Sequence, residues 1–259
     1  MFALTNSEIA ARCPQVFETS YSSRRTKKYG QFTTAQVIDA LRTEGYEVTN
    51  AFAQSVRAEM RPTIHNKHCV RLSHRDFLDT LHPDETRPEI VIVNSHDGSS
   101  SFRIMAGIFR LVCSNGLIIA DETTADNRIC HWKGNSFDSV INTALLVAEQ
   151  AKESYELIDQ MKSQNLTPQQ QKDYATKAAQ IRLAYNKKSQ VNFAENLLVP
   201  HRHEDNITPS IWNTYNVVQE NCIKGGQLVG SRVLRPLTNI SQNVEVNRKL
   251  WQEAVSLIA

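Results

Sequence analysis

Residues 90–121, IVIVNSHDGSSSFRIMAGIFRLVCSNGLIIAD, decide the fold class. Two apolar runs rich in isoleucine, valine and phenylalanine, 90–93 and 104–112, flank a polar turn, and a third run follows at 117–120. Short runs of this kind, bounded by Asn, Asp, Ser and Gly, are typical of consecutive buried strands. Asp97-Gly98 predicts a tight hairpin turn because both residues tolerate positive φ. The stretch therefore predicts the middle of an antiparallel sheet.

Alternating polarity extends this sheet toward the N-terminus. Residues 47–60 and 67–76 alternate apolar and polar side chains, which predicts two strands with one face on the core and one facing outward. If the two strands pair across residues 62–66, the outward face carries four cations, Arg57, Arg61, Lys67 and Arg71. Upstream, Thr33-Thr34-Ala35-Gln36 matches a capping box and predicts a helix that stops at Gly45.

From residue 136 the apolar residues recur at intervals of three and four. This spacing predicts a long amphipathic helix to about Met161, a second helix that begins with Thr167 as N-cap, and two further helices near the C-terminus. The expected fold is therefore α+β, with an antiparallel meander of about four to five strands packed on a long helix and a mainly helical C-terminal half. We expect an N-terminal arm (1–30), a sheet core (31–165) and a helical region (166–259) packed on it as one compact unit.

Composition excludes several classes of protein. The chain has 259 residues with 41% hydrophobic and 22% charged side chains, as in ordinary globular proteins. It contains no apolar run of about 18 residues and no secretory signal, so we expect a cytoplasmic protein that does not enter the membrane. The five cysteines are widely spaced and lack a CxxC pair, which argues against a disulfide framework or a zinc ribbon.

Local clusters of positive charge are the main functional signal, since the net charge is only +2. In residues 20–30, SYSSRRTKKYG, four cations stand beside an aromatic residue: Arg24, Arg25, Lys27, Lys28 and Tyr29. Clustered cations of this kind displace counterions from phosphates, and Tyr29 or Tyr21 offers a stacking face for a base. The alternative interpretation is a solvated loop. The strand cations at 57, 61, 67 and 71 have the same two interpretations, a nucleic-acid groove or a polar sheet face.

Signals for catalysis or metal binding are weaker. His96 beside Asp97 could serve as an acid–base pair or as metal ligands, but such a pair in a turn is more often turn chemistry. The loop LVPHRHEDNIT at 198–208 carries His201, His203 and Glu204, which could hold a divalent metal or form a polar loop. Cys113 has no visible activating base. We therefore expect no cofactor, and an enzyme is the less favoured class.

The block NSHDGSSSFRIMAGIFRLVCSNGL at 94–117 resembles the signature of a phage- and plasmid-associated family catalogued as domain of unknown function 932. Further matching motifs are Trp212–Asn216, Val218–Asn221, Gly225-Gly226 and Asn247–Trp251. The resemblance implies a setting in mobile elements near recombination genes. The order of elements is also similar to the β-β-β-α core of single-strand-annealing proteins, which form rings and bind DNA in a positively charged groove.

Three function classes remain open. The leading hypothesis is a non-enzymatic, sequence-independent binder of single-stranded DNA that acts in phage or plasmid recombination and forms a homo-oligomer. The second is an interaction or counter-defence protein with no nucleic-acid role. The third is a metal-dependent hydrolase that uses His96, Asp97, His201, His203 or Glu204, and it requires two distant loops to meet in space.

Overall fold

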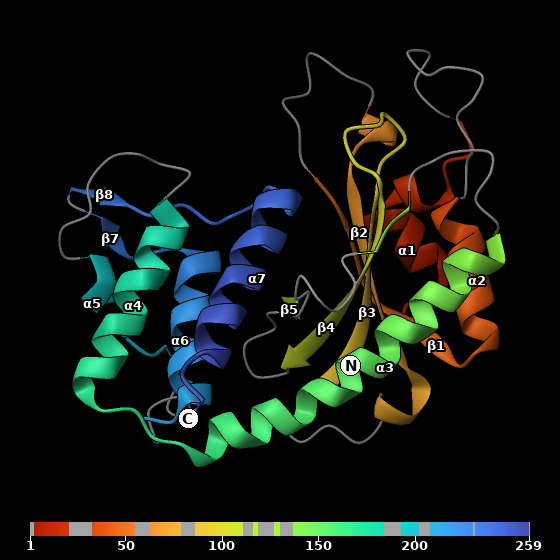
Figure 1. Ribbon diagram of the computed structural model, residues 1–259. Helices are drawn as coiled ribbons and strands as arrows, with labels where there is room; N and C mark the ends of the chain where they lie inside the picture. Colours follow the sequence, from red (N-terminus) through yellow and green to blue (C-terminus); the bar gives the residue numbers. More distant parts are fainter. Residues whose placement is uncertain are drawn as a thin grey trace. The chain divides into compact units, whose positions relative to one another are not determined.

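The computed structural model divides the chain into two compact units, Met1–Lys152 (unit 1) and Glu153–Ala259 (unit 2). It describes residues 3–20, 33–54, 63–78, 86–110, 116–118, 127–129, 137–183, 193–201, 208–229 and 231–258. Unit 1 holds the large sheet and unit 2 is mainly helical (Figure 1). Among the described residues, no helix is both long and apolar enough to cross a bilayer.

Four long strands of unit 1 form an antiparallel meander. They are neighbours in chain order: β1 (Tyr46–Ala53), β2 (His68–His74), β3 (Thr86–Asn94) and β4 (Phe102–Arg110). Two three-residue strands, β5 (Gly116–Ile118) and β6 (Asn127–Ile129), both pair with β4. The predicted α+β fold is confirmed, as is the hairpin between the two strands of the 90–110 stretch.

The register defines two ends of this sheet. Ala53 pairs with His68 and His68 pairs with Asn94, so the β1–β2 and β3–β4 connections leave the sheet at one end. We call this the hairpin end. At the far end, Tyr46 pairs with His74, and β2 and β3 are connected there. β6 runs antiparallel to β4 and finishes at the hairpin end, where Ile129 pairs with Phe102.

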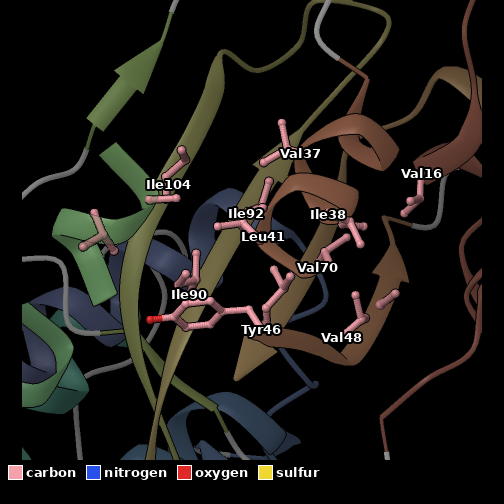
Figure 2. Packing of buried hydrophobic residues seen from close by; sticks show 14 of the residues in the cluster. Val16, Val37, Ile38, Leu41, Tyr46, Val48, Val70, Ile90, Ile92 and Ile104 are labelled. Atoms are coloured by element: carbon pink, nitrogen blue, oxygen red, sulfur yellow. The ribbon is translucent and has the colours of Figure 1, made fainter. Parts of the chain in front are cut away.

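One face of the sheet packs on helices. Alternate strand residues such as Val70, Ile92 and Ile104 join one buried cluster with side chains of α1 (Asn6–Arg12), α2 (Thr34–Thr43) and the first half of α3 (Phe137–Ser163) (Figure 2). A short 3-10 helix, η1 (Pro14–Phe17), adds Val16 to this cluster. The predicted packing of the sheet on a long helix is therefore confirmed.

The second face of the sheet is also buried, which the alternating pattern did not predict. Every residue of β2 from His68 to Ser73 is buried, and β3 is buried from Arg87 to Asn94. On this face, Val91, Val93 and Met105 are essentially inaccessible to solvent. Polar residues on the second face must therefore find partners within the protein.

Unit 2 contains most of the remaining helices. These are α4 (Pro168–Leu183), α5 (Phe193–Leu197), α6 (Ile211–Lys224) and α7 (Ile240–Val255), with a short hairpin of β7 (Leu228–Val229) and β8 (Arg232–Val233). Its core contains aromatic contacts in which Tyr215 stacks on Trp212 and meets Trp251 edge-on. Apolar residues of α4, α6 and α7 bury their inner faces around this group.

The helix signals in the sequence are confirmed at three positions. Thr33 caps α2 in a capping box with Gln36, and Gly45 follows that helix at φ +88°. Thr167 and Gln170 exchange the expected reciprocal hydrogen bonds at the start of α4. α6 begins with Ser210 as its N-cap. The strands β6, β7 and β8 were not predicted, because segments of two or three residues carry almost no periodicity.

Candidate nucleic-acid interface

Four connections leave or reach the sheet at the hairpin end. They are the segments 18–33, 54–67, 95–101 and 130–136, which precede α2, link β1 to β2, link β3 to β4 and follow β6. Described residues at their edges fix this placement. Ser20 Oγ lies 2.9 Å from His65 Nε2, Thr34 Oγ1 lies 2.8 Å from His68 Nε2, and the Gln54 amide donates to the Lys67 carbonyl.

Charge is segregated between the two ends of the sheet. The four hairpin-end connections contain eight Lys or Arg residues and three acidic residues, Glu18, Glu59 and Asp97. The connections at the far end, 44–45, 75–85 and 111–115, contain one cation and five acidic residues. The N-terminus of α2, with its partial positive charge, also lies at the hairpin end. The connections that flank the hairpin end are therefore richer in cations than those that flank the far end.

The structure describes two of the predicted DNA-contacting residues, Lys67 and Arg71. Arg24, Arg25, Lys27, Lys28 and Tyr29 lie outside the described residues, as do Tyr21, Arg57 and Arg61. The two segments that contain them are nevertheless bracketed by described residues at the hairpin end.

Lys67 and Arg103 add described cations at the same end. Both side chains are partly exposed. Burial lowers the pKa of the Lys67 ammonium, and the nearby Arg103 charge lowers it further, whereas Asp97 raises it. Sequence reasoning did not consider Trp132 and Lys133, which follow β6 in the sequence and lie outside the described residues.

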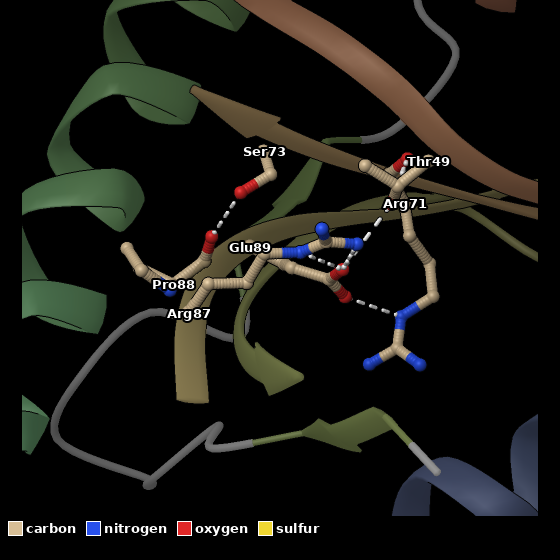
Figure 3. Close-up of polar contacts among 6 residues, drawn as sticks. All are labelled: Thr49, Arg71, Ser73, Arg87, Pro88 and Glu89. Carbon is tan, nitrogen blue, oxygen red and sulfur yellow. Dashed lines mark hydrogen bonds and ion pairs between the residues drawn. The ribbon is translucent and has the colours of Figure 1, made fainter. Parts of the chain in front are cut away.

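The predicted outward-facing row of cations on the sheet is wrong at Arg71. It was expected to face outward with Lys67, but only 7% of its surface is accessible. Its Nε lies 2.7 Å from Glu89 Oε2, and Glu89 also contacts the fully buried Arg87 at 3.4 Å (Figure 3). The alternating pattern at 67–76 predicted an exposed face because it carries no information on Glu89, the partner acid on β3. Arg71 is therefore held by Glu89 and is not a freely exposed cation of an outward sheet face.

His96 and Asp97 have structural roles in the β3–β4 turn. Asp97 Oδ1 accepts a hydrogen bond from the Ser99 amide at 2.8 Å, and Gly98 adopts φ +70°. His96 is buried, and its Nε2 donates to the Gln15 carbonyl at 2.8 Å. Turn geometry and a tertiary hydrogen bond thus account for the pair.

A buried pair of imidazoles lies beneath this turn. The rings of His68 and His96 stack with centroids 5.3 Å apart and an interplanar angle of 22°. His68 Nδ1 donates to the Asn66 carbonyl, which leaves Nε2 to accept from Thr34. These partners suit neutral rings. Burial lowers the pKa of His96 below its usual range.

This burial predicts a stability that depends on pH. Because the folded-state pKa of His96 is below the unfolded-state value of about 6.5, the unfolded chain binds more protons as the pH falls below that value. We expect the free energy of unfolding to decrease from about pH 6.5 downward, by at most about 1.4 kcal/mol per pH unit from this group. Denaturant unfolding of wild type and His96→Gln at several pH values measures the effect, and equal slopes in the two proteins would contradict it.

The second predicted loop lies in unit 2. His201 Nε2 donates to Asn221 Oδ1 at 2.6 Å, so this ring nitrogen serves a structural contact. His203 and Glu204 lie outside the described residues. Within the described ranges, no group of three His, Cys, Asp or Glu side chains is arranged to hold a metal ion. His96 and His201 belong to different units, and each has its own hydrogen-bond partner.

The described cysteines are poorly suited to nucleophilic chemistry. Cys13, Cys69 and Cys222 are buried free thiols, and burial raises the pKa of each to about 12. A thiol with that pKa carries almost no thiolate at neutral pH. Cys113 and Cys130 lie outside the described residues.

The cations of α4 are largely neutralised. On α4, Lys172 Nζ lies 2.8 Å from Glu195, and Lys177 Nζ lies 2.8 Å from Glu253. Arg182 is buried and donates to the carbonyls of Cys222 and Arg235. Asp173 is the one acid within α4 itself, and the partner acids stand 23 and 76 residues away in the sequence. α4 therefore offers little unpaired positive charge for a phosphate backbone.

The C-terminal signature motifs stabilise unit 2. Asn221 is fully buried and its side chain has four hydrogen-bond partners, Leu197, Val199, His201 and Gln227. Asn247 Oδ1 accepts from Gln219 Nε2 at 2.7 Å. Gly225 adopts φ +70°, and a Cβ there would lie 2.4 Å from the Leu234 carbonyl oxygen. These motifs identify a fold and point to no reaction.

Comparisons with known proteins agree with the signature. A family model described as Domain of unknown function (DUF932) matches residues 22–251. The chain is 33% identical over 260 residues to the UPF0380 proteins YfjQ and YafZ of Escherichia coli K12, and each alignment covers 98% of this chain and 92% of the relative. No solved structure matches the chain.

Proposed function

Because the chain belongs to the DUF932 family, whose description names no activity, we propose from the geometry of unit 1 that it binds single-stranded DNA without reacting with it. Family membership confirms the resemblance drawn from the signature block. The observation that supports the proposal is the composition of the connections, with eight cations against three acids in those that flank the hairpin end and the reverse bias in those that flank the far end.

Binding at the hairpin end would be driven by the phosphate backbone. Clustered Lys and Arg side chains release condensed counterions when they neutralise phosphates, and this effect does not depend on base sequence. The same connections carry aromatic side chains, Tyr21, Tyr29 and Trp132, on which unpaired bases can stack. Cations interleaved with aromatic residues favour a single strand over a duplex, whose bases are already stacked.

The test is binding of a fluorescent oligonucleotide, measured by polarisation from about 50 to about 200 mM salt. We expect the logarithm of the affinity to fall linearly with the logarithm of salt concentration. The variant R24Q/R25Q/K27Q/K28Q should lose more than about tenfold in affinity, and its salt slope should decrease by up to about 0.7 for each lost phosphate contact.

A matched control removes the same amount of charge elsewhere. The variant K162Q/K172Q/K177Q/K224Q neutralises four half-exposed lysines, all of which already pair with acidic residues in unit 2. It should bind nearly as wild type does. Absence of binding to single strands, an affinity insensitive to salt, or equal losses in the two variants would overturn the proposal.

We further propose that the protein acts in the cytoplasm, in recombination of phage or plasmid DNA, and that it assembles into a homo-oligomer. These proposals rest on the similarity in element order to annealing proteins. Light scattering of the same samples, with and without oligonucleotide, measures the particle size. A ring-sized particle that changes on addition of DNA supports them, whereas a monomer of constant size contradicts the oligomer.

A further inference from the structure

Arg71 on β2 has an unusual environment. Its side chain is more than nine-tenths buried on the second face of the sheet, next to Val91 in the neighbouring strand. Its one ion pair in the structure joins Nε to Glu89 Oε2 at 2.7 Å. Figure 3 shows the two terminal nitrogens of Arg71 pointing away from Glu89.

The terminal nitrogen Nη2 of Arg71 is buried and has no hydrogen-bond partner among the described residues. A buried guanidinium donor normally meets a carbonyl, a carboxylate or an anionic ligand, because loss of hydration without a new partner is costly. Glu89 cannot fill this role, since it contacts the Arg71 Nε edge and also serves Arg87 and Thr49. The donors of Arg71 therefore exceed the acceptors that the protein provides for it.

We propose that the Nη edge of Arg71 binds a phosphate group on the second face of the sheet. The planar guanidinium offers parallel N–H donors that match two oxygens of a phosphate. Glu89 holds the Nε edge and fixes the orientation of the fork, so that the Nη edge faces the ligand. This geometry favours a phosphate over a halide ion. A halide would accept hydrogen bonds from the guanidinium, but it has no pair of oxygens to match the two parallel N–H donors.

The surroundings of Arg71 fit a phosphate carried by a larger molecule. Two register positions nearer the hairpin end, the same face carries Arg103 on β4, and Lys67 lies just before β2. Val91, Val93 and Met105 form an apolar row on this face. The shared chemistry is a phosphate, and its source is either a free phosphate or nucleotide, or a phosphodiester of a nucleic-acid strand. The site does not depend on the function proposed above.

The experiment is thermal unfolding of the full chain in sodium phosphate and in sodium chloride at matched ionic strength. Parallel arms use a nucleoside monophosphate and a single-stranded oligonucleotide. We expect phosphate to raise the unfolding temperature of the wild-type protein in a saturable way. In R71K, which keeps the charge but loses the fork, the apparent phosphate affinity should fall at least about tenfold. The exposed Arg75 supplies the control, and R75Q should respond as wild type does.

Every outcome decides the proposal. A saturable effect that is lost in R71K supports it, whereas no saturable effect in the wild type, or equal effects in wild type and R71K, overturns it. If R71K does not fold, equilibrium dialysis of wild-type protein against radiolabelled phosphate gives the stoichiometry, and less than one ion per chain at saturation overturns the proposal. Phosphate binding without oligonucleotide binding would support this site and contradict the DNA-binding function. Oligonucleotide binding without phosphate binding would support the DNA-binding function and contradict this site.

Discussion

Replacing Glu89 by glutamine should be among the most damaging single changes to unit 1. The carboxylate has no accessible side-chain surface and lies between two guanidiniums, 2.7 Å from Arg71 and 3.4 Å from Arg87. Glutamine keeps the shape but removes the negative charge and directs an amide N–H₂ at a cation. Breaking a buried ion pair by removing one partner costs about 3–5 kcal/mol, because the remaining charge stays buried. We expect a loss of this size in the free energy of unfolding.

Denaturant titration followed by far-ultraviolet circular dichroism measures this loss. Glu47 supplies the control, since its contact with Arg42 at 3.4 Å is partly exposed and E47Q should cost less than about 1 kcal/mol. In the double variant R71Q/E89Q, the two losses should not add, because each substitution removes the same pair. A loss below about 1 kcal/mol in E89Q would show that Glu89 does not neutralise the buried guanidiniums.

The Arg71–Glu89 pair also shows where sequence reasoning fails. Alternation correctly located β2, the apolar run at 90–93 located β3, and the alternation placed Arg71 on the face opposite Val70 and Leu72. It could not show that this second face is buried, because polar residues on alternate positions are typical of a solvated face. The pairing depends on strand register, which joins residues 18 positions apart.

The hairpin end was predictable only in part. The sequence identified the cation clusters at 24–28 and 57–61 and the Asp97-Gly98 turn, since each is a local pattern. That the segments with these patterns begin or end near the same end of the sheet follows from the meander order and from contacts such as that between Thr34 and His68. The excess of acidic residues in the far-end connections is not a local pattern, because those residues are spread over separate segments of the sequence. Long-range pairing therefore supplied the functional signal.

The helical half was predicted best where caps are explicit. Thr33, Thr167 and Gly225 act through hydrogen bonds or backbone angles within a few residues of their own position, so sequence spacing suffices. The partners of polar residues inside unit 2 were not predictable in the same way. Nothing in the sequence distinguishes Asn221 from the other asparagines of this half. In the structure its side chain joins α6 to the segment 197–201 by hydrogen bonds.

The second prediction with a large expected effect concerns Asn221. Its side chain is fully buried, donates to the carbonyls of Leu197 and Val199 at 2.8 and 3.0 Å, and accepts from His201 Nε2. Alanine would leave both carbonyls and the imidazole without this partner, and each unsatisfied buried group costs about 1–3 kcal/mol. We expect Asn221→Ala to lower the free energy of unfolding of unit 2 by about 3 kcal/mol or more.

Tryptophan fluorescence during denaturant titration follows this loss, because Trp212 and Trp251 are both buried in unit 2. Asn213→Ala is the matched control on the same helix. That side chain is partly exposed and bonds only Thr208, so its removal should cost less than about 1 kcal/mol. Equal effects of the two alanine variants would mean that the amide contacts of Asn221 contribute no more than a surface hydrogen bond. A much larger effect at Asn221 would explain why a buried asparagine belongs to the motif at 218–221.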